Sequence, residues 1–216
     1  NTTDHGLEFP NMKCTLFDQG IGVMLIMRGP GGFNGGKVFD GLTSQIDIFP
    51  TICDLLDIEP PDRLEGKSLI PAIRGDVDTV NDEIFSETTY HASYEPQRTV
   101  RTERWKYIRR YGDFETPVLP NCGDSVSKDL WLNNGWEDRS IDSEQLYDLM
   151  FDTFETNNVA SDSDMADVLN DVRSRLDGWM ERTDDELRPG YFAAPKGAKI
   201  NRQDDLSPQD EPYTVE

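Results

Sequence analysis

The longest regular pattern of apolar positions lies between residues 164 and 181. Apolar side chains recur there every three or four residues, the spacing of one helix face: Met165, Val168, Leu169, Val172, Leu176, Trp179 and Met180. Acidic residues precede this stretch and Arg182 follows it, as the helix dipole prefers. The pattern therefore predicts an amphipathic helix over 164–181.

Shorter patterns predict strands. Residues 99–101 and 105–109 read as two strands joined by a polar turn, and 145–149 is a further candidate. The apolar run 23–27, VMLIM, lies between glycines and predicts a strand buried on both faces of a sheet. After residue 188 the chain is polar and rich in Pro and Gly, which predicts a surface-hugging or disordered tail.

A second helix is predicted over residues 47–56. Asp47 is suited to the N-cap, and Pro50 is tolerated only in a first turn. Cys53 lies in this apolar stretch and is expected in the core. Three apolar residues then share one face: Ile52, Leu55 and Leu56.

The net negative charge of the chain argues against some classes of binding partner. Acidic residues outnumber basic ones 42 to 21, and the net charge is −21. Such a surface repels nucleic acid and anionic membranes, and no stretch approaches the roughly 20 apolar residues of a membrane helix. Self-repulsion of this size is best screened in a salt-rich cytoplasm or medium, which favours a halophilic protein over an acidic mesophilic one.

Few residues are candidates for chemistry. The three cysteines, Cys14, Cys53 and Cys122, are too widely spaced for a disulfide framework or a zinc cluster. We therefore assign no chemical role to them. The two histidines are His5, directly after Asp4, and His91. A carboxylate and an imidazole side by side are able to bind one cation, and Lys13 an anion. Taken alone, an Asp-His pair such as Asp4-His5 is more often an ordinary loop dipeptide than a metal site. A lysine such as Lys13 is more often a solvated surface residue than an anion-binding one.

Read in order, several segments resemble the second half of the sulfatases. The segments are Thr3-Asp4-His5-Gly6, Lys13 before Phe17-Asp18-Gln19-Gly20, Arg28-Gly29-Pro30-Gly31, Gln45-Ile46-Asp47-Ile48-Phe49-Pro50-Thr51, Leu64-Glu65-Gly66-Lys67-Ser68-Leu69, Arg98-Thr99-Val100-Arg101, Trp105-Lys106-Tyr107-Ile108 and Glu144-Gln145-Leu146-Tyr147-Asp148-Leu149. Within the family, Phe9-Pro10, the insertion before Glu144 and the ending 179–184 look most like the heparan N-sulfatases, or sulfamidases.

The resemblance implies an α/β fold, the C-terminal part of an alkaline-phosphatase-like sulfatase. Residues 1–80 would end the large catalytic α/β domain with its mostly parallel sheet. Residues 81–188 would form a C-terminal subdomain with an antiparallel sheet and the amphipathic helix. Residues 189–216 would form the polar tail.

The resemblance also implies roles. Asp4 and His5 would be ligands of one calcium ion, whose other ligands would come from an N-terminal half. His5 and Lys13 would be catalytic, and Lys13 and His91 would bind a sulfated small molecule or glycan. His5 departs from the sulfamidases, which generally have Asn there.

The family's nucleophile is a formylglycine made from Cys or Ser in a Cys/Ser-x-Pro/Ala-x-Arg motif, and no cysteine of this chain fits it. The first residues show neither a Met nor a signal region, so we expect a chain entered in the middle. The resemblance therefore implies a sulfuric ester or sulfamate hydrolase present as a fragment, inactive alone.

Two other functions stay open. One is a metal-dependent phosphodiesterase or phosphatase of the same superfamily, which also carries an Asp-His step and binds zinc. The other is a non-catalytic remnant that binds a sulfated glycan. Finding zinc rather than calcium would favour the first, and the DNA upstream of Asn1 would separate the second from truncation.

We predict that molar salt stabilises the protein, because screening weakens the repulsion among the 42 acidic side chains. Thermal melts in low and in molar potassium chloride measure the effect. An unchanged or lower melting temperature in molar salt would contradict the halophilic interpretation.

Overall fold

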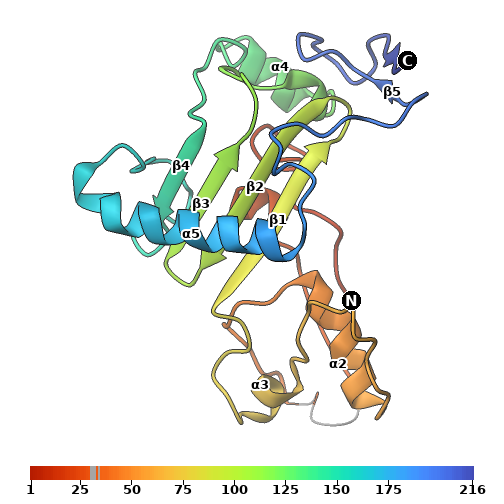
Figure 1. Cartoon of the computed structure of the whole chain (residues 1–216), viewed down its shortest axis with the longest axis vertical. Coiled ribbons are helices and arrows are strands. Elements are labelled where there is room, and N and C mark those ends of the chain that lie inside the picture. Colours follow the sequence, from red (N-terminus) through yellow and green to blue (C-terminus); the bar gives the residue numbers. More distant parts are fainter. Residues whose placement is uncertain (30–32, 34) are drawn as a thin grey trace. The chain divides into compact units, whose positions relative to one another are not determined.

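The computed structural model describes residues 1–29, 33 and 35–216 as two compact units (Figure 1). The smaller unit comprises Asn1–Thr2, Met24–Ile84 and Arg101–Glu103. The larger unit comprises Thr3–Val23, Phe85–Val100 and Arg104–Glu216. Helices and a sheet are both present, which confirms the predicted α/β class. The predicted boundaries at residues 80 and 188 stay predictions.

Most of a four-stranded sheet lies in the larger unit, in the order β1-β2-β3-β4. The strands are β1 (Glu83–Tyr90), β2 (Tyr94–Thr102), β3 (Trp105–Arg110) and β4 (Glu144–Asp148). β3 and β4 are antiparallel, with Tyr107 opposite Leu146. The strands predicted at 99–101, 105–109 and 145–149 are confirmed, and β1 was not predicted.

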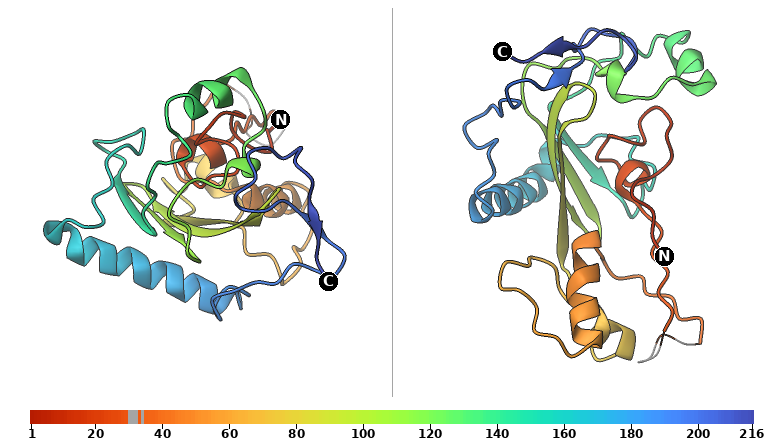
Figure 2. Two further views of the ribbon diagram at one scale, coloured as in Figure 1. Left: turned by 90° about the horizontal axis from the view of Figure 1, so that it is seen from above. Right: turned by 90° about the vertical axis from the view of Figure 1, so that its right-hand side faces the viewer.

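Helix α5 (Ala166–Arg182) covers one face of this sheet (Figure 2). It follows the short 3-10 helix η3 (Ser163–Met165), whose N-cap Asp162 accepts a hydrogen bond from the backbone of Asp164. The predicted apolar face is confirmed. Its buried members pack on strand residues: Leu169, Val172, Leu176 and Met180 against Val100, Tyr107 and Leu146.

The opposite face of the sheet carries the segment Thr3–Val23, called here the N-terminal segment (Figure 2). Its only helix is α1 (Asp18–Ile21). Leu16 packs there against Ile108 and Tyr147. Side chains alternate between the two faces of a strand, so Tyr107 contacts α5 while Ile108 and Lys106 face the N-terminal segment.

A buried charge cluster joins the N-terminal segment to the sheet. Lys106 is fully buried, and its Nζ lies 2.6 Å from Asp18 Oδ1 and 3.4 Å from Glu155 Oε1. The backbone N–H of Asp18 donates to Glu155 Oε2 at 2.6 Å. Burial raises the pKa of Glu155, and the charge of Lys106 opposes that shift. The cation therefore favours the charged form of Glu155 and offsets part of the cost of burying that carboxylate.

The smaller unit is organised around buried Asp47. The unit contains η1 (Gln45–Asp47), α2 (Ile48–Leu55) and α3 (Ile70–Arg74). The Asp47 carboxylate accepts hydrogen bonds from the backbone N–H groups of Ser44 and Lys67 and from the Asn81 amide, all at 2.8 Å. Contrary to the prediction, the Asp47 side chain does not cap α2; it completes a capping box at the start of η1 with Ser44 as the N-cap, and it also connects chain segments 34 residues apart.

Two apolar predictions for the smaller unit were wrong. The run 23–27 contributes only an isolated bridge between Thr2 and Leu25, and Met24 and Ile26 are exposed. The predicted apolar face of α2 is exposed as well: Ile52, Leu55 and Leu56. α2 instead buries Pro50, Thr51 and Cys53, and the Thr51 hydroxyl accepts a hydrogen bond from the backbone N–H of Leu69. Cys53 was predicted correctly.

The remaining elements were not predicted. They are η2 (Leu119–Asn121), α4 (Val126–Leu132), β5 (Lys199–Ile200) and β6 (Tyr213–Thr214). β5 and β6 form a small antiparallel ladder, so the polar tail hugs the larger unit with regular structure of its own.

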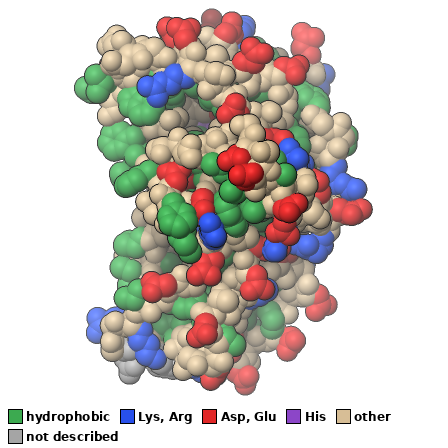
Figure 3. All heavy atoms as spheres, turned by 90° about the vertical axis from the view of Figure 1, so that its left-hand side faces the viewer, with side chains coloured by type: hydrophobic (Ala, Val, Ile, Leu, Met, Phe, Trp, Pro, Cys, Tyr) green, Lys and Arg blue, Asp and Glu red, His purple; other side chains and the backbone are tan. Residues whose placement is uncertain are grey.

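Two surface properties match the composition. Asp and Glu side chains are spread over the face drawn in Figure 3 rather than gathered into one patch. Within the described ranges, no helix is both long and apolar enough to cross a membrane.

We predict that Lys106→Met costs about 3–5 kcal/mol of unfolding free energy at pH 7, because two carboxylates lose their buried cation. The loss should shrink toward pH 5. Without Lys106 the folded-state pKa of Glu155 rises further, so the penalty is present above that value and disappears as the carboxyl protonates. Urea denaturation at both pH values measures it.

Arg104→Ala is the matched control, because Arg104 forms a solvent-exposed ion pair with Asp148. Removing that pair should change stability little. Equal losses in the two variants would show that the Lys106 cluster does not attach the N-terminal segment.

Candidate functional site

The N-terminal segment folds back on itself through two glycines. The Gly6 N–H donates to Gly20 O at 2.9 Å, and a Cβ on Gly6 would lie 1.9 Å from Gln19 O. A Cβ on Gly20 would lie 2.2 Å from Met12 O. Only glycine permits this approach of backbone to backbone. The Asp-His-Gly step and the Gly20 turn are therefore parts of one closed loop, which also contains Lys13.

Asp4 and His5 lie at the entrance to this loop. His5 Nε2 is 3.6 Å from Asp4 Oδ2, and His5 Nδ1 is 2.6 Å from Gly6 O. A carbonyl oxygen only accepts hydrogen bonds, so Nδ1 is the donor in this contact and Nε2 is the ring nitrogen nearer to Asp4. Asp4 is exposed. The pair thus presents one carboxylate and one imidazole nitrogen toward the same side.

Lys13 is held by a carboxylate that the motif analysis did not single out. Its Nζ lies 3.4 Å from Glu8 Oε1, and its backbone N–H donates to Leu7 O at 3.0 Å. The Glu8 side chain is about half exposed, whereas that of Lys13 is mostly covered. No sequence spacing signals this pairing, because it depends on how the loop closes.

His91 belongs to the turn between β1 and β2, far from the N-terminal segment in sequence. The side-chain oxygen of Asn121 accepts from the backbone N–H groups of Ala92 and Ser93, at 3.0 and 2.8 Å. The Asn121 amide in turn donates to Glu95 at 2.8 Å. This buried network fixes the turn that carries His91, and sequence reasoning did not find it.

The structure brings His91 to the N-terminal segment. The pKa of His91 is lowered from its usual 6.5 by partial burial first, and then by the nearby positive charges of Lys13 and His5, with Glu8 acting in the opposite direction. Both histidines and Lys13 are thus close enough to interact electrostatically. The roles of Asp4, His5, Lys13 and His91 stay predictions.

The residues present fit only part of a calcium shell. Calcium takes about six to eight oxygen ligands. Asp4 supplies carboxylate oxygens, and His5 Nε2 lies 3.6 Å from one of them. Among residues 1–29, 33 and 35–216, no group of three or more His, Cys, Asp or Glu is arranged to hold a metal ion.

The cysteines near this site are poor nucleophiles. Burial raises the pKa of Cys14 to about 11, and burial also raises the pKa of Cys122. The thiolate is the reactive form, so a raised pKa suppresses reactivity near neutral pH. The loop Arg28-Gly29-Pro30-Gly31, part of the motif series, lies partly outside the described residues.

Comparison with known proteins identifies relatives. Residues 8–121 match the family described as "N-sulphoglucosamine sulphohydrolase, C-terminal". An ulvan-active sulfatase of Formosa agariphila is 26% identical over 199 residues, covering 90% of this chain and 39% of that protein. The N-sulphoglucosamine sulphohydrolase of Homo sapiens is 27% identical over an alignment of 246 residues, covering 98% and 45% respectively. The chain thus spans less than half the length of these relatives.

Solved structures agree. A 2-O GAG sulfatase has a TM-score of 0.62 and 28% identity, covering 85% of this chain and 35% of that one. The phosphonate monoester hydrolase of Agrobacterium radiobacter, at TM-score 0.51 and 23% identity over 94% of this chain and 35% of that one, shares the fold alone. The predicted alkaline-phosphatase-like fold is confirmed. The match over residues 8–121 shows that the chain belongs to the N-sulphoglucosamine sulphohydrolase C-terminal family, within the sulfatases.

Proposed function

We propose that this chain is the C-terminal part of a sulfuric ester or sulfamate hydrolase, in which Lys13, His5 and His91 contact the sulfuryl group. The observation that carries the proposal is that Lys13, in a chain with net charge −21, lies in the closed loop that begins beside His5, and that its charge acts on His91. In so acidic a protein, such a gathering of cationic and imidazole groups favours an anionic ligand.

The Lys13–Glu8 ion pair suits a site in which a ligand replaces Glu8 as the partner of Lys13. Glu8 is half exposed, so water screens this ion pair and makes it weak. An incoming sulfuryl group competes with Glu8 for the ammonium, and Lys13 then donates to sulfuryl oxygens. Cleavage leaves negative charge on those oxygens and on the departing atom, and the positioned ammonium stabilises it.

Asp4 and His5 would hold one side of a calcium ion, with the remaining ligands supplied from beyond this chain. When bound, such an ion stabilises negative charge on the sulfuryl oxygens. The hydrogen bond from His5 Nδ1 to Gly6 O orients the ring so that Nε2 faces the same side as Asp4.

An exposed apolar surface in the smaller unit supports the assignment to part of a larger domain. Its members include large side chains between 43% and 63% exposed: Met24, Ile26, Phe49, Ile52, Leu56 and Ile58. Phe49, Ile52 and Leu56 lie three and four residues apart along α2 and its C-cap, and exposed apolar side chains on one helix face favour a contact with another protein element. This chain aligns with only 39% and 45% of two of its relatives, so the rest of such a protein is long enough to supply that element.

The proposal includes inactivity of the isolated chain. No Cys or Ser here begins a Cys/Ser-x-Pro/Ala-x-Arg motif, so the chain lacks the family's precursor of formylglycine. Charge stabilisation without the covalent nucleophile leaves little catalysis.

We predict no measurable hydrolysis of an aryl sulfate or of N-sulfoglucosamine by this chain alone. Joined to an N-terminal sulfatase half with its formylglycine, the protein should hydrolyse one of these substrates, and Lys13→Ala should then remove most of the activity. Lys196→Ala, at an exposed lysine of the tail, is the control. Turnover by the chain alone would mean that a nucleophile was overlooked, and an active Lys13→Ala enzyme would refute the sulfate-binding role.

The site makes a second prediction that does not need activity. His91 should titrate below pH 6.5, and Lys13→Ala should raise its pKa, because the variant removes a neighbouring positive charge. Sodium sulfate should also raise the pKa, since a bound anion favours the imidazolium. NMR of the two imidazoles measures both effects, with His5→Gln and His91→Gln for assignment.

Sodium chloride at equal ionic strength and Lys196→Ala serve as controls for this titration. If neither Lys13→Ala nor sulfate changes the pKa of His91, the side chains of His91 and Lys13 do not share an anion site.

A further inference from the structure

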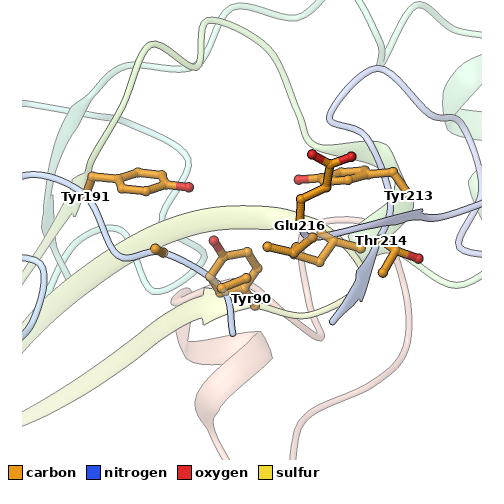
Figure 4. Close-up of a pocket in the computed structure, with 9 residues that line it drawn as sticks. Tyr90, Tyr191, Tyr213, Thr214 and Glu216 are labelled. Carbon is orange, nitrogen blue, oxygen red and sulfur yellow. The ribbon is translucent and has the colours of Figure 1, made fainter. Parts of the chain in front are cut away.

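Three tyrosines line an open pocket next to the turn that carries His91. The pocket has a volume of about 410 Å³ and is bordered by residues of β1, β6 and the tail: Tyr90, Tyr191, Ala193, Ala194, Ile200, Tyr213, Thr214, Val215 and Glu216. Figure 4 shows the rings of Tyr191 and Tyr213 on opposite sides, with Tyr90 between them. Most of this lining lies outside the family match at residues 8–121.

The pocket walls are held in place by contacts within the larger unit. The Tyr90 hydroxyl donates to Phe192 O at 3.0 Å, and the Tyr90 ring lies 4.8 Å from that of Tyr94. Tyr191 packs edge-on against Tyr94, at 5.4 Å. The backbone N–H of Val215 donates to Ala198 O at 2.9 Å, which closes the β5–β6 side. The pocket is therefore built before any ligand arrives.

Tyr191 and Tyr213 nevertheless keep much of their surface in water. They are 62% and 42% exposed, although large aromatic side chains are normally covered. A tyrosine offers an apolar ring face together with a hydroxyl that donates and accepts hydrogen bonds. Two such faces beside an open pocket suit a flat ligand whose faces carry C–H groups and whose rim carries hydroxyls.

A pyranose ring has this chemistry. Its C–H faces stack on aromatic rings, and its hydroxyls bond to tyrosine hydroxyls and to a carboxylate such as Glu216. As far as the described residues go, the lining contains a carboxylate and no Lys, Arg or His. The pocket therefore favours an uncharged sugar over a sulfated or carboxylated one.

The position of the pocket connects it to the sulfate site. Tyr90 directly precedes His91, and the tail is tied to the same turn by a hydrogen bond from Asn201 N to Ala92 O at 2.8 Å. The charge of Lys13 in turn acts on His91. One turn therefore connects the pocket wall with the proposed sulfate site.

We propose that the Tyr90–Tyr191–Tyr213 pocket is a saccharide subsite for an uncharged sugar unit of a sulfated glycan. The glycan assignment rests on the proposed function, whereas saccharide binding by the pocket stands by itself. The pocket thereby selects a sulfated oligosaccharide over a small sulfate ester.

Calorimetric titration of this chain with cellotetraose and with chitotetraose, both uncharged, tests the subsite. At least one should bind, and Tyr191→Ala and Tyr213→Ala should each weaken binding about tenfold or more by removing a stacking face. Tyr191→Phe retains the ring and should retain most of the affinity. Phe154→Ala, at an aromatic side chain 72% exposed outside the pocket, is the matched control. Both tyrosines are largely exposed, so their replacement should leave the fold intact, and circular dichroism checks this.

Each outcome decides the question. Binding lost with the tyrosines but kept in Lys13→Ala supports the subsite, whatever the result for sulfate. No binding of either saccharide, equal binding by Tyr191→Ala and Tyr213→Ala, or tighter binding of 4-nitrophenol than of the saccharides overturns it. Failure of the sulfate-dependent shift of His91 with saccharide binding intact would overturn the proposed function instead.

Discussion

The buried ammonium of Lys106 is the constraint on which the site depends. Lys106 lies on the sheet face that α5 does not cover, between Asp18 and Glu155. Asp18 belongs to the loop that Gly6 and Gly20 close, so one charge cluster fixes the loop on the strand. Removing one partner of such a cluster destabilises the fold by more than the intact cluster stabilises it, because the remaining charges stay buried without solvation. The loop that carries Lys13 is thereby attached to β3, an inner strand of the sheet.

A second polar network fixes the other half of the site. Glu95 is buried between Arg110 of β3 and Asn121, and Asn121 accepts hydrogen bonds from the backbone of the His91 turn. Burial raises the pKa of Glu95, while Arg110 and Asn121 favour its charged form. Both networks reach β3, the first through Lys106 and the second through Arg110. The N-terminal segment and the His91 turn are therefore both anchored to the same strand.

The electrostatics of the site are unusual for so acidic a chain. Lys13 and both histidines are near one another, and Glu8 is the carboxylate paired with the lysine. The tyrosine pocket beside His91 has the opposite character, with hydroxyls, aromatic faces and a carboxylate. One end of the turn thus favours an anionic group and the other an uncharged one. Such a division would let one ligand be recognised by two different interactions.

The sequence by itself determined the elements whose signals are local. The helix at 164–181 and the strands around residue 105 follow from the spacing of apolar residues over a few turns or pairs. Asp4, His5 and Lys13 were found because ordered motifs identify a family. Only the tertiary structure decided the partners of these residues: Glu8 beside Lys13, Asn121 beneath His91, and Lys106 between carboxylates 88 positions before it and 49 after it. It also decided that the apolar face of α2 and the run 23–27 are exposed. Local patterns report which side chains avoid water, whereas the chain segment that covers them or pairs with them is set by contacts distant in sequence.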